Sequence, residues 1–209
     1  MFPLRGVILL PRTTLPLNVF EPRYLAMISD VLAGERMLAV LQPKAPAGDE
    51  QSPEGKTFPL RTVGGIGRLT AFSETDDGRI LITLTGICRL ELAGETETED
   101  PYRTIEADYE PYADDLIRGE GEDAVDRDRL LTVLKTYLEA HELTADWDSI
   151  NHSTNERLVN TLSMISPYGA EEKQALLEAP DLKSRAEVLV ALAEMELAAR
   201  DDGTESTMQ

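Results

Sequence analysis

The stretch ILITLTGICRLEL, residues 80–92, decides the fold of this chain. One parity of the stretch is apolar: Ile82, Leu84, Cys88, Leu90 and Leu92. The other parity is largely polar: Thr83, Thr85, Arg89 and Glu91. Because successive side chains of a strand point to opposite faces, this alternation predicts a strand with one face in the core. Gly86 interrupts the pattern and predicts a bulge or tight bend, which curls a sheet toward a barrel.

The sequence on both sides of this stretch predicts further strands. Residues 62–72 precede it, and the turn Thr75-Asp76-Asp77-Gly78 follows them; Asp-Gly between two apolar runs is typical of a β-hairpin. An alternating segment lies at residues 104–110. Apolar or extended runs nearer the N-terminus predict strands at residues 7–10, 15–17 and 37–41. We therefore expect a compact, curled β-domain.

Helical spacing marks one early segment and the whole C-terminal part. Residues 22–34 begin with proline, which suits the first turn of a helix, and end with glycine, a frequent stop. Beyond residue 125, apolar residues recur at helical spacing in four stretches. The stretches are Leu130, Leu134, Tyr137 and Leu138; Leu158, Leu162 and Ile165; residues 171–178; and Leu182, Ala186, Leu189 and Leu192 or Ala193, with Asp181 as the cap of the last. The C-terminal part is therefore expected to be a helical bundle.

The predicted fold class is α+β, a β-domain with one early helix followed by the helical bundle. The expected divisions are a β-domain at residues 1–112, an acidic linker at 113–124, a bundle at 125–200 and a frayed tail at 201–209. Residues 43–57 carry three prolines and two glycines with almost nothing apolar, so they predict an exposed loop.

The charge and the cysteine content exclude several classes of protein. The net charge is −19, and residues 91–128 hold fifteen acids against three arginines. Nucleic-acid binding draws most of its affinity from neutralising phosphates with Lys and Arg, so we expect no nucleic-acid partner. The single cysteine excludes an intramolecular disulfide and favours a reducing compartment, the cytoplasm. No apolar run approaches the ~18 residues of a membrane helix, so no membrane partner is expected.

Two glycine-containing motifs resemble nucleotide-binding loops and fail on inspection. Gly55-Lys56-Thr57 ends like a phosphate-binding loop, but Glu50 stands where that motif needs glycine, and Pro53 removes an amide donor. Gly64-Gly65-Ile66-Gly67 lacks the third glycine of a dinucleotide fingerprint, since Thr70 stands there. We expect these glycines to let a strand bend or pack closely against its neighbour.

No arrangement of side chains predicts catalysis or a metal site. His141 and His152 flank two aspartates, but their spacing matches no zinc pattern, and helix-end or loop positions explain both better. Cys88 lies on the core-facing parity of its strand and not in an electropositive site. Because no nucleophile lies beside a base, the chain is predicted not to be an enzyme and to need no cofactor.

Three blocks of the sequence resemble the Lon N-terminal domain family. The first spans residues 2–32, with Phe2-Pro3-Leu4, Pro11, Leu15-Pro16-Leu17 and Glu21-Pro22-Arg23-Tyr24 in the family's order. The second runs from Val63-Gly64 through Arg68 to DDGRILITLTGICRLEL, with Gly86 and Arg89 as its G-x-x-R segment. The third, residues 172–192, is similar to the family's last helices, with Lys173-Gln174, Asp181 and Arg185 in register.

This resemblance implies a PUA-like β pseudo-barrel followed by a helical bundle. In Lon proteases the region recognises substrate proteins and is followed by an ATPase and a Ser-Lys peptidase. The chain ends where those domains would begin, so neither activity is expected of it. The Glu21-Pro22-Arg23-Tyr24 entry further resembles free-standing bacterial members of the family.

The resemblance therefore implies a non-catalytic module that recognises unfolded or apolar polypeptide segments. Such a module could serve as a proteolysis adaptor, with a protease as partner, or as a chaperone-like protein. We expect the binding groove between barrel and helices, with Phe20, Tyr24 and Arg61 as candidate contacts, although Tyr24 also suits a scaffold role. The acidic surface favours clients with basic residues. The alternative is a small-molecule pocket on the PUA-like barrel; the oligomeric state is left open.

Overall fold

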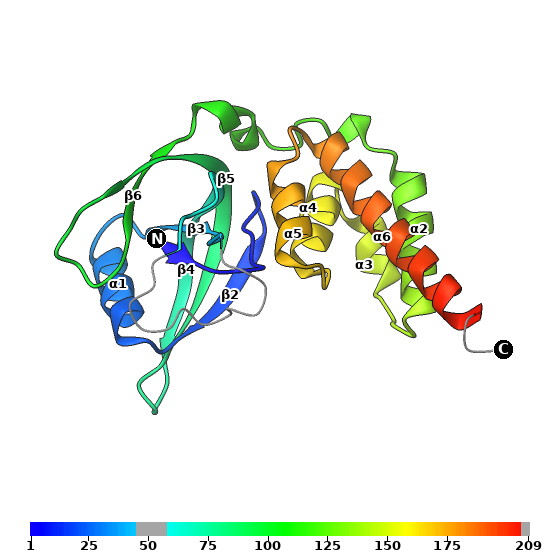
Figure 1. Cartoon of the computed structure of the whole chain (residues 1–209). Helices are drawn as coiled ribbons and strands as arrows, with labels where there is room; N and C mark the ends of the chain where they lie inside the picture. Colours follow the sequence, from blue (N-terminus) through cyan, green and yellow to red (C-terminus); the bar gives the residue numbers. More distant parts are fainter. Residues whose placement is uncertain (45–57, 206–209) are drawn as a thin grey trace. The chain divides into compact units, whose positions relative to one another are not determined.

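The computed structural model describes residues 1–44 and 58–205 (Figure 1). The loop expected at residues 43–57 and the end of the expected tail, 206–209, lie almost wholly outside the described residues. Contacts divide the chain into two compact units. Unit 1 is Met1–Arg118 with Pro167–Leu177, and unit 2 is Gly119–Ser166 with Glu178–Gln209. The chain thus passes between the units three times, and the linker expected at residues 113–124 stays a prediction.

Unit 1 is built on one curled sheet. Its strands are β1 (Phe2–Pro3), β2 (Thr14–Val19), β3 (Met37–Leu41), β4 (Val63–Glu74), β5 (Ile80–Thr96) and β6 (Thr104–Asp108). The strand order is β1-β3-β4-β5-β2, and β6 also pairs with β5. β1 runs parallel to β3, and the other pairs are antiparallel. The Met1 ammonium donates to the Arg103 carbonyl at 2.8 Å, which links the start of β1 to the start of β6 and draws the sheet toward a closed barrel.

The bend predicted at Gly86 is present as an irregularity between β4 and β5. Ile66 pairs with Cys88 and Gly67 pairs with Gly86, so one extra residue of β5 lies between the two pairs. Such a bulge increases the local twist and turns the strand. The hairpin turn predicted before β5 is also confirmed, with Gly78 at a positive φ of 79°.

Residues 8–10 are core residues but form no strand, so the strand expected at 7–10 is wrong. Ile8, Leu9 and Leu10 are at most 2 % exposed. Their backbone crosses directly over two glycines of the sheet: a Cβ at Gly65 would lie 2.0 Å from the Leu9 oxygen, and one at Gly86 would lie 2.0 Å from the Leu10 oxygen. Gly65 therefore packs closely against a neighbouring segment, as the sequence predicted, and Gly86 does so in addition to its predicted bend.

Helices in unit 1 lie against the sheet. Helix α1 (Pro22–Ala33) begins with Pro22 at its N-terminus and ends before Gly34, as predicted; it buries Tyr24, Met27 and Ile28. A 3₁₀ segment, η1 (Glu110–Leu116), follows β6. Helix α5 (Ala170–Glu178) places residues up to 177 in unit 1, although its neighbours in sequence belong to unit 2.

Buried polar side chains hold α5 on the sheet of unit 1. The Gln42 amide accepts from the Gly6 N–H at 2.7 Å and donates to Gln174 at 3.1 Å, and Gln174 donates to the Val63 carbonyl at 3.1 Å. Arg89 forms a bidentate ion pair with Asp115 of η1, with both N–O distances 2.9 Å. Its guanidinium also donates to the Leu177 carbonyl at 3.3 Å.

Unit 2 is helical. Its α-helices are α2 (Arg127–Ala140), α3 (Trp147–His152), α4 (Asn155–Ile165) and α6 (Leu182–Glu205), with a short 3₁₀ turn η2 (Glu122–Ala124). The sequence did not predict α3, which has only 6 residues. Ile165 is 69 % exposed, so its expected inward position is wrong; it is the last residue of α4. Among the described helices, none is long and apolar enough to span a membrane.

Candidate interaction surface

The outer side of β2, β5 and β4 near the hairpin forms the candidate site, which we call the open β face. Cross-strand pairing brings its members side by side in rows. The rows are Thr14, Thr85 and Arg68; Pro16, Thr83 and Ala71; and Asn18, Leu81 and Ser73, with Phe20 and Arg79 beyond the last row. Figure 1 shows the β4–β5 hairpin extending away from the rest of unit 1.

Alternation along the strands explains why this side is open. In β5, Ile82 and Leu84 point into the core and are 2 % and 0 % exposed, whereas Leu81 between the hairpin and Ile82 is 46 % exposed. In β2 the residues of the open β face are exposed and those between them are half-buried or buried. A sheet packed on one side only shows this pattern, because the second side meets solvent.

The hairpin end of the open β face carries exposed apolar side chains. Phe20 directly follows β2 and is 60 % exposed. The Arg79 guanidinium lies over its ring, 5.6 Å from the centroid. Leu81 is two residues after Arg79 and points to the same side of the sheet. Because Arg79 lies next to Phe20, Leu81 is a diagonal neighbour of Phe20. Phe72, 51 % exposed, pairs with core-facing Ile82 and therefore belongs to the opposite side of the hairpin.

The middle of the open β face carries hydroxyl groups and no carboxylate. The Thr70 hydroxyl lies 2.9 Å from the Thr85 hydroxyl and donates to the Thr83 carbonyl at 3.2 Å. The charged members of the open β face are both arginines. Arg79 pairs with Asp77 at 2.9 Å, whereas Arg68 is exposed and makes no ion pair within the part of the chain that is described.

The three residues expected at a binding site lie in different surroundings. Phe20 belongs to the open β face. Tyr24 is 6 % exposed and stacks on Phe2 with ring centroids 4.4 Å apart, and burial raises the pKa of its phenol. Arg61 forms an ion pair with Glu171 of α5. The binding roles of Tyr24 and Arg61, the groove between barrel and helices and the alternative small-molecule pocket stay predictions.

Sequence reasoning missed most of the open β face, including Arg68 and Leu81. One signal was visible: Leu81 is an apolar residue at a parity that otherwise carries Thr83 and Thr85. A single apolar residue on a solvent-facing parity is common on protein surfaces, so this signal alone does not indicate a contact site. Phe20 gave no comparable signal, because its exposure depends on where β2 ends.

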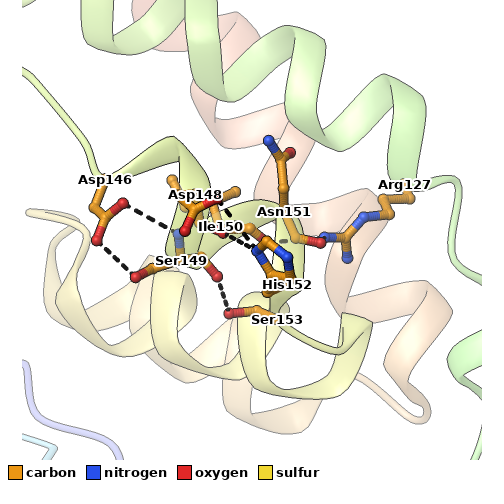
Figure 2. Close-up of polar contacts among 8 residues, drawn as sticks. All are labelled: Arg127, Asp146, Asp148, Ser149, Ile150, Asn151, His152 and Ser153. Atoms are coloured by element: carbon orange, nitrogen blue, oxygen red, sulfur yellow. Dashed lines mark hydrogen bonds and ion pairs between the residues drawn. The ribbon is translucent and has the colours of Figure 1, made fainter.

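His152 and its neighbouring aspartates belong to the local structure of α3. Figure 2 shows Asp146 capping the helix, where its carboxylate accepts from the Ser149 N–H at 3.1 Å. The His152 ring bonds the Asp148 carbonyl at 2.7 Å, and Arg127 donates to the Ile150 carbonyl at 2.8 Å. These contacts satisfy the two ends of a short helix.

His141 has partners of its own on α2 and α6. Its ring stacks on Tyr137 with centroids 4.1 Å apart, and its Nε2 lies 3.1 Å from a Glu196 carboxylate oxygen. Among the described residues, no group of three or more His, Cys, Asp or Glu side chains could hold a metal ion. Cys88 is 5 % exposed on its strand, and burial raises the pKa of its thiol, which disfavours the reactive thiolate.

Comparisons with known proteins agree with this architecture. The chain is 26 % identical to a Lon protease of Desulfosudis oleivorans, over 88 % of this chain and 22 % of that protein. It is 29 % identical to a Lon protease of Parabacteroides distasonis, over 89 % of this chain and 22 % of that protein. The chain thus spans about a quarter or less of the length of these relatives.

Solved structures show the same fold. A Lon N-terminal domain protein from Xanthomonas campestris matches with a TM-score of 0.59 at 21 % identity, over 91 % of this chain and 95 % of that one. The N-terminal domain of a Mycobacterium avium complex Lon protease matches with a TM-score of 0.65 at 18 % identity, over 93 % and 96 %. The predicted α+β fold with a PUA-like β pseudo-barrel is confirmed.

The family model described as the ATP-dependent protease La (LON) substrate-binding domain matches residues 1–194. That range covers β1 to β6 and α1 to α5, and most of α6. The chain therefore belongs to the LON substrate-binding domain family.

Proposed function

We propose that this chain binds unfolded or apolar segments of other polypeptides through the open β face. One observation carries the proposal: in a chain of net charge −19, a side of three strands carries no carboxylate and ends in two exposed apolar side chains, Phe20 and Leu81. Exposed apolar side chains gathered on a surface without acidic groups are typical of sites for protein partners.

The chemistry of the open β face suits an extended polypeptide. Phe20 offers a large apolar surface of the kind that dominates binding energies. The open β face reaches the edge of the sheet, because β2 is the last strand in the sheet order. Hydroxyls on this face, such as that of Thr70, can form hydrogen bonds with the backbone of a bound polypeptide. Pro16 in β2 removes one backbone donor from that edge, so side chains rather than an added strand make the contacts.

The remaining candidate residues support this surface indirectly. Tyr24, stacked on Phe2, fixes the start of α1, and Phe20 lies two residues before that helix. Arg61 fixes α5 through Glu171. Both are positioning residues in this proposal, and Phe20 is the contact residue.

Two cellular roles follow from polypeptide binding without catalysis. As an adaptor, the chain would deliver clients to a protease; as a chaperone-like protein, it would shield their apolar segments. Its named relatives are Lon proteases, which supports a link to proteolysis. We place the protein in the cytoplasm, because its one cysteine is free and buried.

A peptide-binding experiment with matched variants tests the proposal. Fluorescently labelled apolar and aromatic peptides are titrated with the protein, and anisotropy reports binding. Phe20→Ser and Leu81→Ser should each weaken binding by about tenfold, the usual effect of removing an apolar anchor of more than ~1 kcal/mol. Phe72→Ser, on the opposite side of the same hairpin, is the control and should leave binding unchanged.

The melting temperatures of the variants separate binding from folding. Phe20 and Leu81 are both exposed, so neither variant should lower the melting temperature by more than the Phe72 control does. If none of the peptides binds, or if the control weakens binding as much as the two site variants, the open β face is not the polypeptide site.

A further inference from the structure

The two arginines of the open β face lie at opposite ends of it. Arg79 lies beside the hairpin, close to Phe20, and Asp77 already neutralises much of its charge at 2.9 Å. Arg68 lies at the far end, opposite Thr85, and has no ionic partner in the described part of the chain. The rows between them hold Thr, Ser, Asn, Pro, Ala and Leu side chains. The far end therefore offers one uncompensated positive charge.

The spacing between this charge and the apolar end follows from strand geometry. Thr85, the partner of Arg68, is four residues from Leu81 along β5. At a rise of ~3.3 Å per residue, about 13 Å separates their rows, and Phe20 lies about two residues further. An extended polypeptide anchored at Phe20 and Leu81 would reach Arg68 with a residue four to six positions away.

We infer that the polypeptide segment bound here carries an aspartate or glutamate four to six residues from its apolar anchor. This rests on the proposed function of the open β face and names the chemistry of its partner. The carboxylate pairs with Arg68, while the aromatic or aliphatic side chains of the segment pack on Phe20 and Leu81. Extended segments with both features at this separation bind better than equally apolar segments without the acid.

Net charge alone suggests the opposite preference, for basic clients. The acids of the chain attract a basic segment at long range. At physiological ionic strength, however, salt largely screens the interaction between exposed charges that are more than ~8 Å apart. At contact, the nearest charge of the open β face without an ionic partner among the described residues decides the preference, and that charge is Arg68. A lysine at this position of the client would meet a like charge.

The test uses one series of peptides that share an aromatic-aliphatic anchor. The residue five positions from the anchor is Asp, Asn or Lys, and the remaining residues are Ser and Gly. The full-length protein should bind the Asp peptide about twofold to fivefold more tightly than the Asn peptide, the range for one exposed ion pair, with the Lys peptide weakest. An Asp placed next to the anchor should give no gain, since Arg68 is out of reach there.

The decisive experiment reverses the charge at Arg68. Arg68→Glu should invert the order, so that the Lys peptide binds most tightly. Arg157→Glu is the matched control, because Arg157 is an exposed arginine on α4 in unit 2 and the change in net charge is the same. It should leave the order Asp, Asn, Lys intact. Added salt should shrink the differences within the series while leaving the Asn peptide nearly unaffected.

The outcomes separate this inference from the proposed function. If the Asn peptide binds and needs Phe20, but Asp brings no gain or Arg157→Glu inverts the order equally, the acid preference is refuted and polypeptide binding stands. If no peptide binds at all, both fail. If the protein instead self-associates through this surface, sedimentation at rising protein concentration will show dimers that Phe20→Ser abolishes, which also refutes the inference.

Discussion

Lys173 gives a quantitative prediction for the pH dependence of stability. It lies on α5 within unit 1 and is 3 % exposed, and burial lowers the pKa of its ammonium group from 10.5 to about 8. A lowered pKa means that the folded protein holds this proton more weakly than the unfolded chain does. Folding is therefore penalised while Lys173 is charged in both states, and the shift corresponds to about 3 kcal/mol.

The direction of the pH effect follows from the two pKa values. Below about pH 8 both states are protonated, so the full penalty is present. Between about pH 8 and 10.5 the folded protein loses the proton first, and its stability rises; above 10.5 the penalty is gone. From pH 7 to 9.5 the gain from this group should be about 2 kcal/mol.

The variant Lys173→Met removes the titrating group while keeping an apolar stem of similar length. The free energy of unfolding of wild type minus that of Lys173→Met should rise by about 2 kcal/mol between pH 7 and 9.5, because every other titrating group cancels in the difference. Lys135→Met, at an exposed lysine of α2 in unit 2, should show no such rise.

Urea unfolding at each pH, followed by the circular dichroism of the strands, measures the stability of unit 1. The single tryptophan, Trp147, is on α3 in unit 2, so its fluorescence reports the other unit and should not follow the Lys173 substitution. A pH-independent difference between wild type and Lys173→Met would show that the Lys173 ammonium is not penalised by burial. The reasoning would then be wrong.

Two further predictions concern the packing of unit 1. Gly86→Ala should destabilise the folded protein by about 3 kcal/mol or more, since the new Cβ would lie 2.0 Å from the Leu10 oxygen. Gly94→Ala is the control and should change the stability by under ~0.5 kcal/mol, because no atom lies within 4 Å of its Cβ position. Equal effects of the two variants in urea unfolding would contradict this prediction. Arg89→Ala should cost about 3–5 kcal/mol, because the largely buried Asp115 carboxylate loses its ion-pair partner and keeps the hydrogen bond from the backbone N–H of residue 89. Asp115→Asn should cost less, because the amide oxygen can still accept a hydrogen bond from Arg89. A loss below ~1 kcal/mol for Arg89→Ala would show that the pair is not buried in solution.

Local patterns were sufficient to predict most elements of the sheet. The Asp-Gly turn and the Pro22 helix start depend on neighbouring residues alone, and both are present in the structure. The alternation in residues 80–92 correctly predicts a strand, but the bulge after Gly86 turns Leu90 to the side opposite Leu84, and Arg89, expected on the polar side, is buried. Residues 8–10 are different. They have the composition of a strand, but Gly65 and Gly86 leave room for their backbone to cross the sheet, and this contact links positions far apart in sequence.

The placement of α5 and the open β face could not be derived from local patterns either. Periodicity predicts that residues 171–178 are helical, but the partners Gln42 and Val63 that hold α5 on unit 1 lie more than 100 residues away. Likewise Arg68 and Phe20 share one surface only because β2 and β4 both pair with β5. Strand order is a tertiary property that alternation does not encode.

The distribution of acids over the sheet supports a functional reason for the open β face. On the second half of β5, Glu91 lies directly opposite Asp108 of β6, an arrangement of like charges that destabilises a sheet. The same strand, at residues 81–85, carries no acid at all. If solubility alone governed the surface, acids spread along β5 would serve as well and would avoid the repulsion. Their restriction to one half fits a surface kept free of carboxylates, as the proposed contact with apolar segments requires.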